Sequence, residues 1–227
     1  MTAVATVAGR TLLEGRAAPD AQVRLATPAG AAVLAKADGG GQWRLRLPPG
    51  AGLRLFGLSM TEGERTVQSE GYLAVAPAGG VRALAAQLRA GAGALVLTDI
   101  PPVSGAAPHI LAVDFDRQGG AVVSGGGAPG ADVILKVDGA PHGRLRVDAG
   151  GRFSMALNEP LTPGDHRLEA VGADVSAAVN VPVSAAAPLT AGPFLAARTP
   201  FGWRIDWMTP GGGVQTTFLI APSETMS

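Results

Sequence analysis

Apolar and polar residues alternate along several short stretches of the chain. In the clearest stretch Val133, Leu135 and Val137 fall on one face, while Asp132 and Lys136 fall on the other. A period of two in a run rich in β-branched residues is typical of a half-buried β-strand. Strands with this pattern are therefore predicted at 132–137, 152–157 and 166–171.

Turn-forming residues separate these predicted strands. They are Pro129-Gly130, Asp138-Gly139, Asp148-Ala149-Gly150-Gly151 and Pro163-Gly164. Such pairs favour tight turns because glycine tolerates a positive φ angle and proline fixes φ. Short strands with a turn about every ten residues are typical of a sandwich or barrel. The stretch from Ala121 to Val171 therefore predicts one small all-β module.

The same pattern occurs earlier in the chain, at residues 7–57. Equivalent positions lie 110 residues apart, as in the pairs Pro19 and Pro129, Asp38 and Asp148, and Trp43 and Phe153. Separate blocks that keep one offset without a gap indicate an internal duplication. Each copy is followed by a further predicted strand, at 71–77 and at 174–183. Pro182 lies in the second of these strands and predicts an edge position or the strand's end, because proline cannot donate to a ladder.

The stretch between the copies, 78–108, has a different pattern and is predicted to be a linker. Its apolar residues Val81, Leu84, Ala85 and Leu88 recur at helical spacing, so a short helix is one interpretation. A strand at 94–98 is another. Either way, we expect one short ordered piece that packs on a neighbouring sandwich.

The C-terminal segment, 185–227, contains the most distinctive pattern. Trp203, Ile205 and Trp207 alternate with polar residues, a glycine-rich turn follows, and a second apolar stretch begins at Val214. This pattern predicts a β-hairpin at 201–220. The hairpin could complete the second sandwich, pair with both modules, or form an exposed platform.

Composition and charge narrow the function classes. The 227 residues suit one large domain or two small ones, and 47% hydrophobic residues with a mean hydropathy of +0.25 support folding. The formal net charge of zero gives no basic footprint for nucleic acid or an anionic membrane. No stretch is long and apolar enough to predict a membrane span.

Few residues here suit catalysis or metal binding. The chain has no cysteine, which excludes disulfides, thiolate metal sites and cysteine nucleophiles. His109, His142 and His166 are scattered, and no Gly-x-Ser-x-Gly elbow or phosphate-binding loop occurs. The acidic residues at predicted turns suit hydrogen bonding within the turn; they are Asp38, Asp138, Asp148 and Asp165. We therefore expect no catalytic residue, no metal and no cofactor.

The compartment stays open at this point. The first sixteen residues contain no basic segment followed by an apolar one, as a signal peptide would. This favours the cytoplasm, an export route without an N-terminal signal, or a leader trimmed from the sequence. The abundance of alanine, glycine and arginine is typical of a GC-rich bacterial genome.

Three stretches carry a family resemblance, namely Gly125–Val133, Asp148–Phe153 and Pro163–Leu168. They resemble the bacterial Ig-like repeat modules of envelope and surface proteins, and a similar pattern occurs in the carboxypeptidase regulatory-like, or prealbumin-like, sandwich. The resemblance covers about two thirds of the chain. It implies a cell-envelope or extracellular location and a role as spacer, stalk or interaction platform.

The resulting prediction is an all-β protein with two tandem Ig-like β-sandwich modules. The modules span 1–77 and 109–184, with the linker at 78–108 and the hairpin segment at 185–227. Some pilin-type sandwich modules form Lys–Asn isopeptide cross-links, but Lys36 and Lys136 do not lie in the first strand of either copy, where that family places its lysine.

The candidate binding residues lie on the hairpin. Trp203 and Trp207, with Phe201 and Arg204 beside them, could stack on sugar rings or anchor a protein. The alternative is that the two indoles cover a hydrophobic core. We therefore expect a non-catalytic structural or protein-interaction module of a bacterial envelope or surface assembly. The alternatives are a carbohydrate- or peptidoglycan-binding accessory protein that uses this hairpin, and a cytosolic scaffold.

Overall fold

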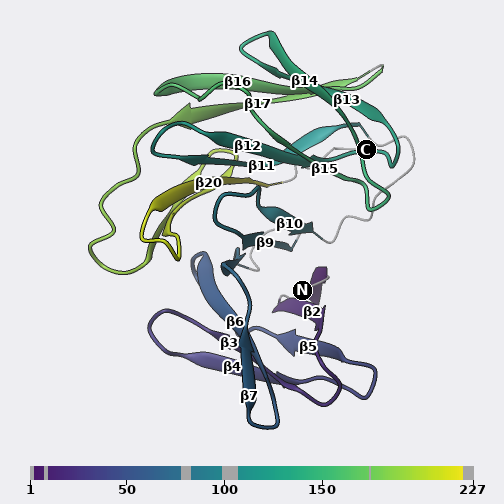
Figure 1. The fold of residues 1–227 in the computed structure, drawn as a ribbon, viewed down its shortest axis with the longest axis vertical. Coiled ribbons are helices and arrows are strands. Elements are labelled where there is room, and N and C mark those ends of the chain that lie inside the picture. Colours follow the sequence, from purple (N-terminus) through teal and green to yellow (C-terminus); the bar gives the residue numbers. More distant parts are fainter. Residues whose placement is uncertain (1–2, 8–9, 78–82, 99–106, 174, 222–227) are drawn as a thin grey trace. The chain divides into compact units, whose positions relative to one another are not determined.

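The computed structural model describes residues 3–7, 10–77, 83–98, 107–173 and 175–221. The regular secondary structure of these residues consists of β-strands alone, and the paired strands are antiparallel (Figure 1). The prediction of an all-β protein is confirmed. The chain divides into two compact units: unit 1 is Met1–Arg89 with Leu97–Ile100, and unit 2 is Ala90–Val96 with Pro101–Ser227.

The strands β1 to β10 form two sheets, with strand orders β1-β2-β5 and β10-β9-β8-β6-β3-β4, and β7 pairs with β6; all belong to unit 1 except the first two residues of β10, Leu95 and Val96. The strands are β1 (Ala3–Val7), β2 (Arg10–Arg16), β3 (Gln22–Ala26), β4 (Ala32–Lys36), β5 (Gln42–Arg46), β6 (Arg54–Glu62), β7 (Arg65–Gln68), β8 (Tyr72–Val75), β9 (Leu84–Leu88) and β10 (Leu95–Thr98). Alternate residues of β3 and β5 are buried, including Val23, Leu25 and Trp43. This burial reproduces the period of two in the sequence.

Unit 2 contains a six-stranded sheet, β15-β12-β11-β20-β19-β18, and a four-stranded sheet, β14-β13-β16-β17. The strands are β11 (His109–Asp116), β12 (Ala121–Gly126), β13 (Asp132–Val137), β14 (Ala140–Arg146), β15 (Arg152–Ala156), β16 (Gly164–Val171), β17 (Ser176–Val183), β18 (Phe194–Thr199), β19 (Gly202–Met208) and β20 (Val214–Ile220). The sheets form two layers (Figure 1), and a core of residues from both lies between them, including Leu135 and Leu168 from one sheet and Val113, Phe153 and Phe218 from the other.

In two strand pairs, β2 with β5 and β3 with β4, positions of unit 1 pair as the positions 110 residues later pair in unit 2. Leu12 pairs with Arg46 as Val122 pairs with Ala156, and Gln22 pairs with Lys36 as Asp132 pairs with Arg146. The turns agree too. The Ala17 N–H donates to the Gly41 carbonyl at 2.9 Å, and the Gly127 N–H donates to the Gly151 carbonyl at 3.0 Å.

An aromatic ring fills the same place in both units. A Cβ added to Gly15 would overlap the indole of Trp43, and one added to Gly125 would overlap the ring of Phe153. Trp43 and Phe153 are buried. Glycine at this position of the strand therefore makes room for an aromatic side chain in the core.

The C-terminal hairpin completes the six-stranded sheet of unit 2. Its strands are β19 and β20, as predicted, and β20 pairs with β11. A third strand, β18, precedes the hairpin and was not predicted. β17 lies at an edge and contains Pro182, which confirms the prediction from that proline.

The helical interpretation of the linker is wrong. Leu84, Ala85 and Leu88 lie in the strand β9, which is buried on both faces. Such a strand has no alternation of apolar and polar residues, so its sequence can imitate helical spacing. The alternative strand at 94–98 is confirmed by β10, while residues 78–82 and 99–106 of the predicted linker lie outside the described residues.

Candidate functional site

The four candidate binding residues do not share one surface. Trp203 and Trp207 face the same side of β19, where they are paired with Leu219 and Gln215 of β20. Arg204 alternates with them and lies on the opposite side. Phe201 packs against the core of unit 2, with its ring centroid 5.9 Å from that of Phe218.

Both indoles are covered. Trp207 is fully buried, and its Nε1 donates to Thr217 Oγ1 at 3.1 Å. Trp203 is 9% exposed, and the Arg198 guanidinium lies 5.4 Å from the centre of its ring. Sugar binding needs an open aromatic face, which neither indole offers here.

A buried polar network lies on the same face of the sheet as Trp207. The Thr217 hydroxyl donates to Asp114 Oδ1 at 2.5 Å, and the Ala94 N–H donates to Asp114 Oδ2 at 2.7 Å. The Gly91 N–H donates to Gln215 Oε1 at 3.2 Å. The segment 90–96 is therefore tied to the sheet of unit 2 by its backbone.

Glycine is required where this segment passes over the sheet. A Cβ on Gly93 would lie 2.5 Å from Ser124 Oγ and 2.8 Å from Ser154 Oγ. Sequence reasoning missed this site. The available signal was Asp114, an aspartate inside the apolar run 110–115, because a carboxylate in such a run needs buried donors.

Arg204 ties the chain between β17 and β18 to the hairpin. Its Nη2 donates to the Ser184 and Ala185 carbonyls at 3.0 and 3.1 Å, and its Nε donates to Asp206 Oδ1 at 3.0 Å. Asp206 is buried and also accepts from the Thr216 hydroxyl at 2.7 Å. The charge of Arg204 is thus matched inside the unit, which gives this residue a structural role.

His166 links two turns of unit 2. Its Nδ1 lies 2.7 Å from Asp138 Oδ2, and its Nε2 lies 2.7 Å from the Thr162 carbonyl oxygen. Both partners are acceptors, so only the doubly protonated imidazolium donates to both. Asp138 also accepts the Arg167 N–H at 2.8 Å.

The environment of this pair shifts both pKa values. Burial lowers the pKa of His166, but the hydrogen bonds to Thr162 and Asp138 outweigh it, helped by the charges of Asp138 and Asp165, and the net shift is upward. The pKa of Asp138 is lowered, first by the Arg167 N–H and then by His166. Both shifts favour the ion pair.

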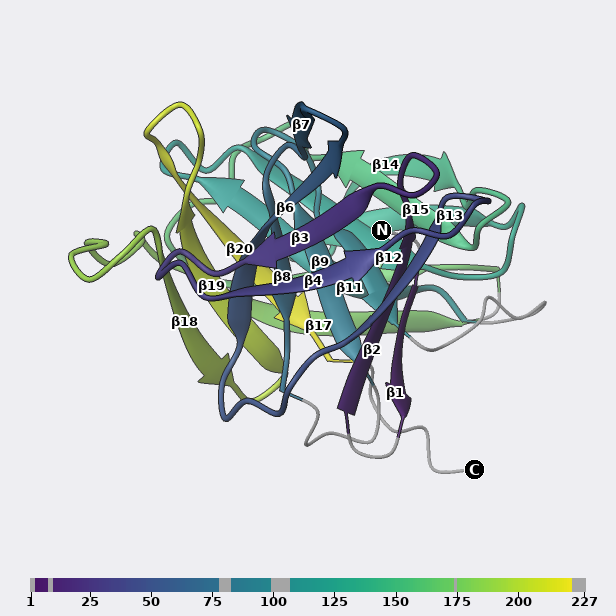
Figure 2. The ribbon, with the colours of Figure 1, turned by 90° about the horizontal axis from the view of Figure 1, so that it is seen from below.

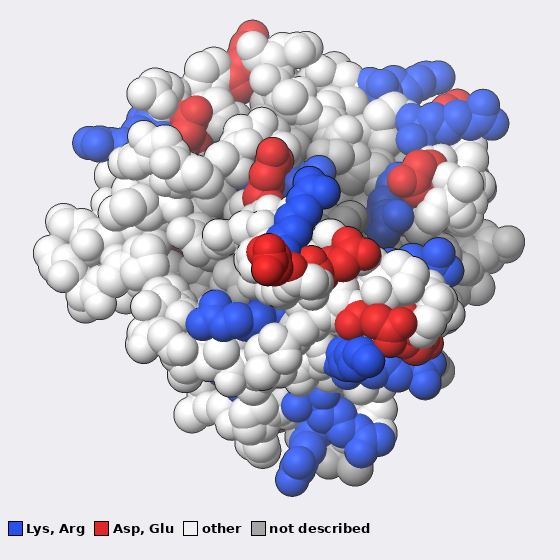
Figure 3. All heavy atoms as spheres, turned by 60° about the horizontal axis from the view of Figure 1, so that its bottom comes forward, with Lys and Arg blue, Asp and Glu red and all other residues white. Residues whose placement is uncertain are grey.

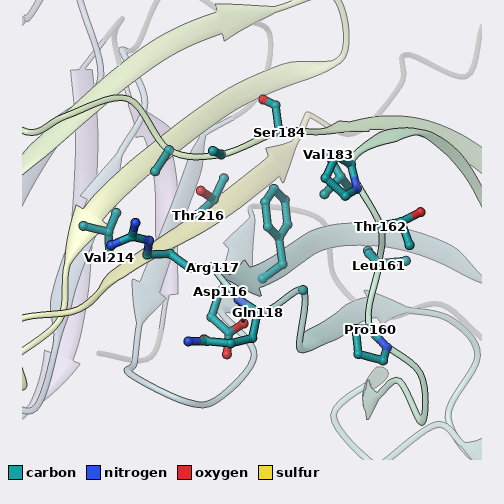
Figure 4. Close-up of a pocket in the computed structure, with 15 residues that line it drawn as sticks. Asp116, Arg117, Gln118, Pro160, Leu161, Thr162, Val183, Ser184, Val214 and Thr216 are labelled. Atoms are coloured by element: carbon teal, nitrogen blue, oxygen red, sulfur yellow. Dashed lines mark hydrogen bonds between the residues drawn. The ribbon is translucent and has the colours of Figure 1, made fainter.

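A cleft of about 370 Å³ in unit 2 is lined in part by Thr162, whose carbonyl oxygen is bonded to His166 (Figure 4). Phe115, Leu161 and Val183 supply apolar walls. Of its polar groups, Asp116 Oδ1 accepts the Gln118 and Gly120 N–H groups at 2.9 and 3.0 Å, and Ser184 and Thr216 are bonded to the Arg204–Asp206 pair. These groups hold the surrounding loops.

Two of the four predicted turn aspartates, Asp38 and Asp148, accept backbone N–H groups within their turns as predicted, whereas Asp138 accepts from His166 and from the Arg167 N–H. Asp38 Oδ1 accepts the Gly40 and Gln42 N–H groups at 2.9 and 2.8 Å, and Asp148 Oδ1 accepts the Arg152 N–H at 2.9 Å. Among the described residues, no three histidine, cysteine or acidic side chains gather closely enough to hold a metal ion.

Acidic and basic side chains are interspersed over the surface drawn in Figure 3. This distribution fits the formal net charge of zero. In the part of the chain that the structure describes, there is no helix that could span a membrane. No model of a known protein family matches the chain, and no curated protein matches it either.

Proposed function

We propose that this chain is a non-catalytic structural and protein-interaction component of a bacterial cell-envelope or surface assembly. In this proposal it consists of two tandem Ig-like β-sandwich modules, which correspond to units 1 and 2. The glycan-binding alternative would require the hairpin to expose its indoles. The cytosolic scaffold would use the same modules in another compartment.

The repeated frame of hydrogen bonds is the observation that carries the proposal. The positions shared by the two units are turn aspartates, turn glycines and a buried aromatic residue, such as Asp38, Gly41 and Trp43 in unit 1. The two turn aspartates, Asp38 and Asp148, use their carboxylates to accept backbone N–H groups of their own turns, and the glycines and aromatic rings shape the strands. A duplicated unit with only structural residues in common favours a building role.

The His166–Asp138 pair resembles catalytic machinery more than any other group described above, but its role is structural. An Asp–His pair acts in catalysis when the second imidazole nitrogen faces a nucleophile. Here that nitrogen of His166 faces the Thr162 carbonyl, which holds no proton to give up. The pair therefore supports the loop beside the cleft.

Fractionation of the source cells, followed by native separation of each fraction, tests the proposal. We expect the protein in the envelope or surface fraction, in complexes larger than the 22.7 kDa chain. A protein found only as a monomer in the soluble fraction would contradict both the location and the assembly role. Isolated cell wall serves as a second probe: saturable binding of the wild-type chain would favour the glycan-binding alternative.

A further inference from the structure

The strand β4 (Ala32–Lys36) is an open edge of unit 1. It is the last strand of its sheet and pairs only with β3 among the described strands. Figure 2 shows the two strands side by side. Leu34, at the centre of β4, is 56% exposed, more than any other large apolar side chain in the described residues.

The hydrogen-bond pattern shows which backbone groups of β4 point outward. The Ala37 N–H donates to the Ala21 carbonyl, and the Thr27 N–H donates to the Ala31 carbonyl, both toward β3. In an antiparallel pair the bonded positions recur every second residue. The backbone groups of 33 and 35 therefore face β3, and those of 32, 34 and 36 face away from it.

The equivalent edge of unit 2 is protected, while β4 is not. Arg144 of β14 lies 110 positions after Leu34, and Pro141 precedes it on the same strand. The pairing of β13 with β14 also shifts register between Leu135 and Lys136, which marks a bulge. Charges, proline and bulges are the usual means by which an edge strand avoids pairing with another chain. The pairing of β3 with β4 has no such shift, and Lys36 is the one charged residue of β4.

We propose that β4 pairs with β4 of a second copy of this chain, antiparallel and about a two-fold axis at Leu34. This contact deepens the proposed assembly role and rests on it. Leu34 lies opposite Leu34 of the second copy, and Ala32 lies opposite its Lys36. The two lysines are therefore apart, and each keeps its partner, Asp20, at 3.0 Å in its own chain. A two-fold contact uses the same patch on both copies, which a strand that is neutral at its centre permits.

The size of the contact sets its strength. Two five-residue strands bury far less than the roughly 1,200 Å² of a stable protein interface. The pair is therefore a weak dimer in dilute solution, and it becomes populated where many copies lie close together, because effective concentration then replaces affinity.

Sedimentation equilibrium of the purified chain, from about 10 μM to about 1 mM, tests the pairing. We expect a reversible monomer–dimer equilibrium for the wild type. Leu34→Pro removes the outward N–H and leaves the bonds to β3, and Leu34→Arg introduces the residue of β14. Each should raise the dissociation constant by roughly tenfold or more. Leu195→Arg, on the edge strand β18 with 48% exposure, is the matched control and should dimerise as the wild type does.

Cross-linking supplies a second readout with an intact strand. The chain has no cysteine, so Leu34→Cys carries a single thiol close to the proposed two-fold axis. A short bis-maleimide should join two copies, and Leu195→Cys should react only with single copies. A wild type that stays monomeric at the highest concentration, or equal cross-linking of both variants, would overturn the pairing. That result would leave the proposed function intact, because fractionation tests it separately.

Discussion

Units 1 and 2 share a frame of strand pairs, turn hydrogen bonds and glycine–aromatic contacts, but they differ in the residues that surround it. The strand pairs, the aspartate turns and the glycine–aromatic contacts recur at an offset of 110. The features outside the frame differ. By strand pairing, His166 of unit 2 stands where unit 1 has Arg54, and Asp138 stands where unit 1 has Pro28, so unit 1 has no counterpart of their ion pair. The comparison separates residues that build the fold from residues that individualise each unit.

The two units also differ in the register of β3 with β6 and of β13 with β16. Arg24 pairs with Ser59 in unit 1, while the equivalent Ile134 pairs with Val171 in unit 2, two residues beyond the position that matches Ser59. A shift of two residues keeps every side chain on its own face, whereas a shift of one would turn the core outward. The frame therefore tolerates this difference.

Removal of the shared aromatic ring should produce the largest effect. Trp43→Ala and Phe153→Ala each leave a cavity in a close-packed core, and each should destabilise its unit by about 3–5 kcal/mol. Urea denaturation of the two variants measures this, with the exposed Val67→Ala as a control that should change little. If only one of the two variants lost less than about 1 kcal/mol of unfolding free energy, the two aromatic positions would not be equivalent.

A methyl group on the matching glycine should have the next largest effect. Gly15→Ala and Gly125→Ala force the aromatic ring to shift, which costs about 1–3 kcal/mol. Gly125→Ala should be the worse of the two, because its Cβ also meets the His109 carbonyl oxygen, which is backbone and yields less. The order is checked by thermal unfolding, and the reverse order would contradict the role given to that carbonyl.

The turn aspartates should contribute less. Asp38→Ala and Asp148→Ala each remove a carboxylate that accepts backbone N–H groups, which should cost about 1 kcal/mol. Asn should restore part of the loss, because its side-chain oxygen accepts the same bonds. If Asn and Ala were equally destabilising at both positions, the hydrogen bonds would not be the cause.

The smallest difference is one of pH dependence and belongs to unit 2 alone. Because the pKa of His166 is raised on folding, its stabilising contribution is complete below the unfolded pKa of about 6.5 and is lost as pH rises through the folded pKa. The lowered pKa of Asp138 adds stability above about pH 3.9, which is lost as pH falls through its folded pKa.

Denaturation curves recorded from the range between about pH 3.9 and 6.5 into mild alkali should therefore show that the free energy of unfolding of the wild type declines. His166→Gln should lack this decline, while His142→Gln should keep it. An identical slope in all three proteins would mean that the imidazolium does not hold Thr162 and Asp138 together.

Sequence periodicity predicted the parts of the fold where one face is buried and the other exposed. Val133, Leu135 and Val137 illustrate this, since all three are buried as expected. Strands that are covered on both faces, such as β9 and β11, lack that alternation. The sequence therefore suggested a helix at β9 and gave no strand signal at β11. β18 was missed because its alanines resemble a loop as much as a strand.

The candidate site was harder to predict than the fold. The alternation of Trp203 and Trp207 was predicted correctly, but whether a face of a hairpin is open depends on what covers it, which no local pattern records. The link between His166 and Asp138 joins residues 28 positions apart in the chain. It requires the register of β13 with β16, which depends on the packing of the whole unit.

Native-state amide hydrogen exchange tests the repeated frame and its open edge together. We expect matched protection at the equivalent amides of Ala17 and Gly127, and of Ala37 and Val147, because each donates to the same carbonyl position in its own unit. At low concentration the Leu34 amide should exchange rapidly while those of Val33 and Ala35 are protected. Unmatched protection within these pairs, or a protected Leu34 amide in the dilute monomer, would contradict the account.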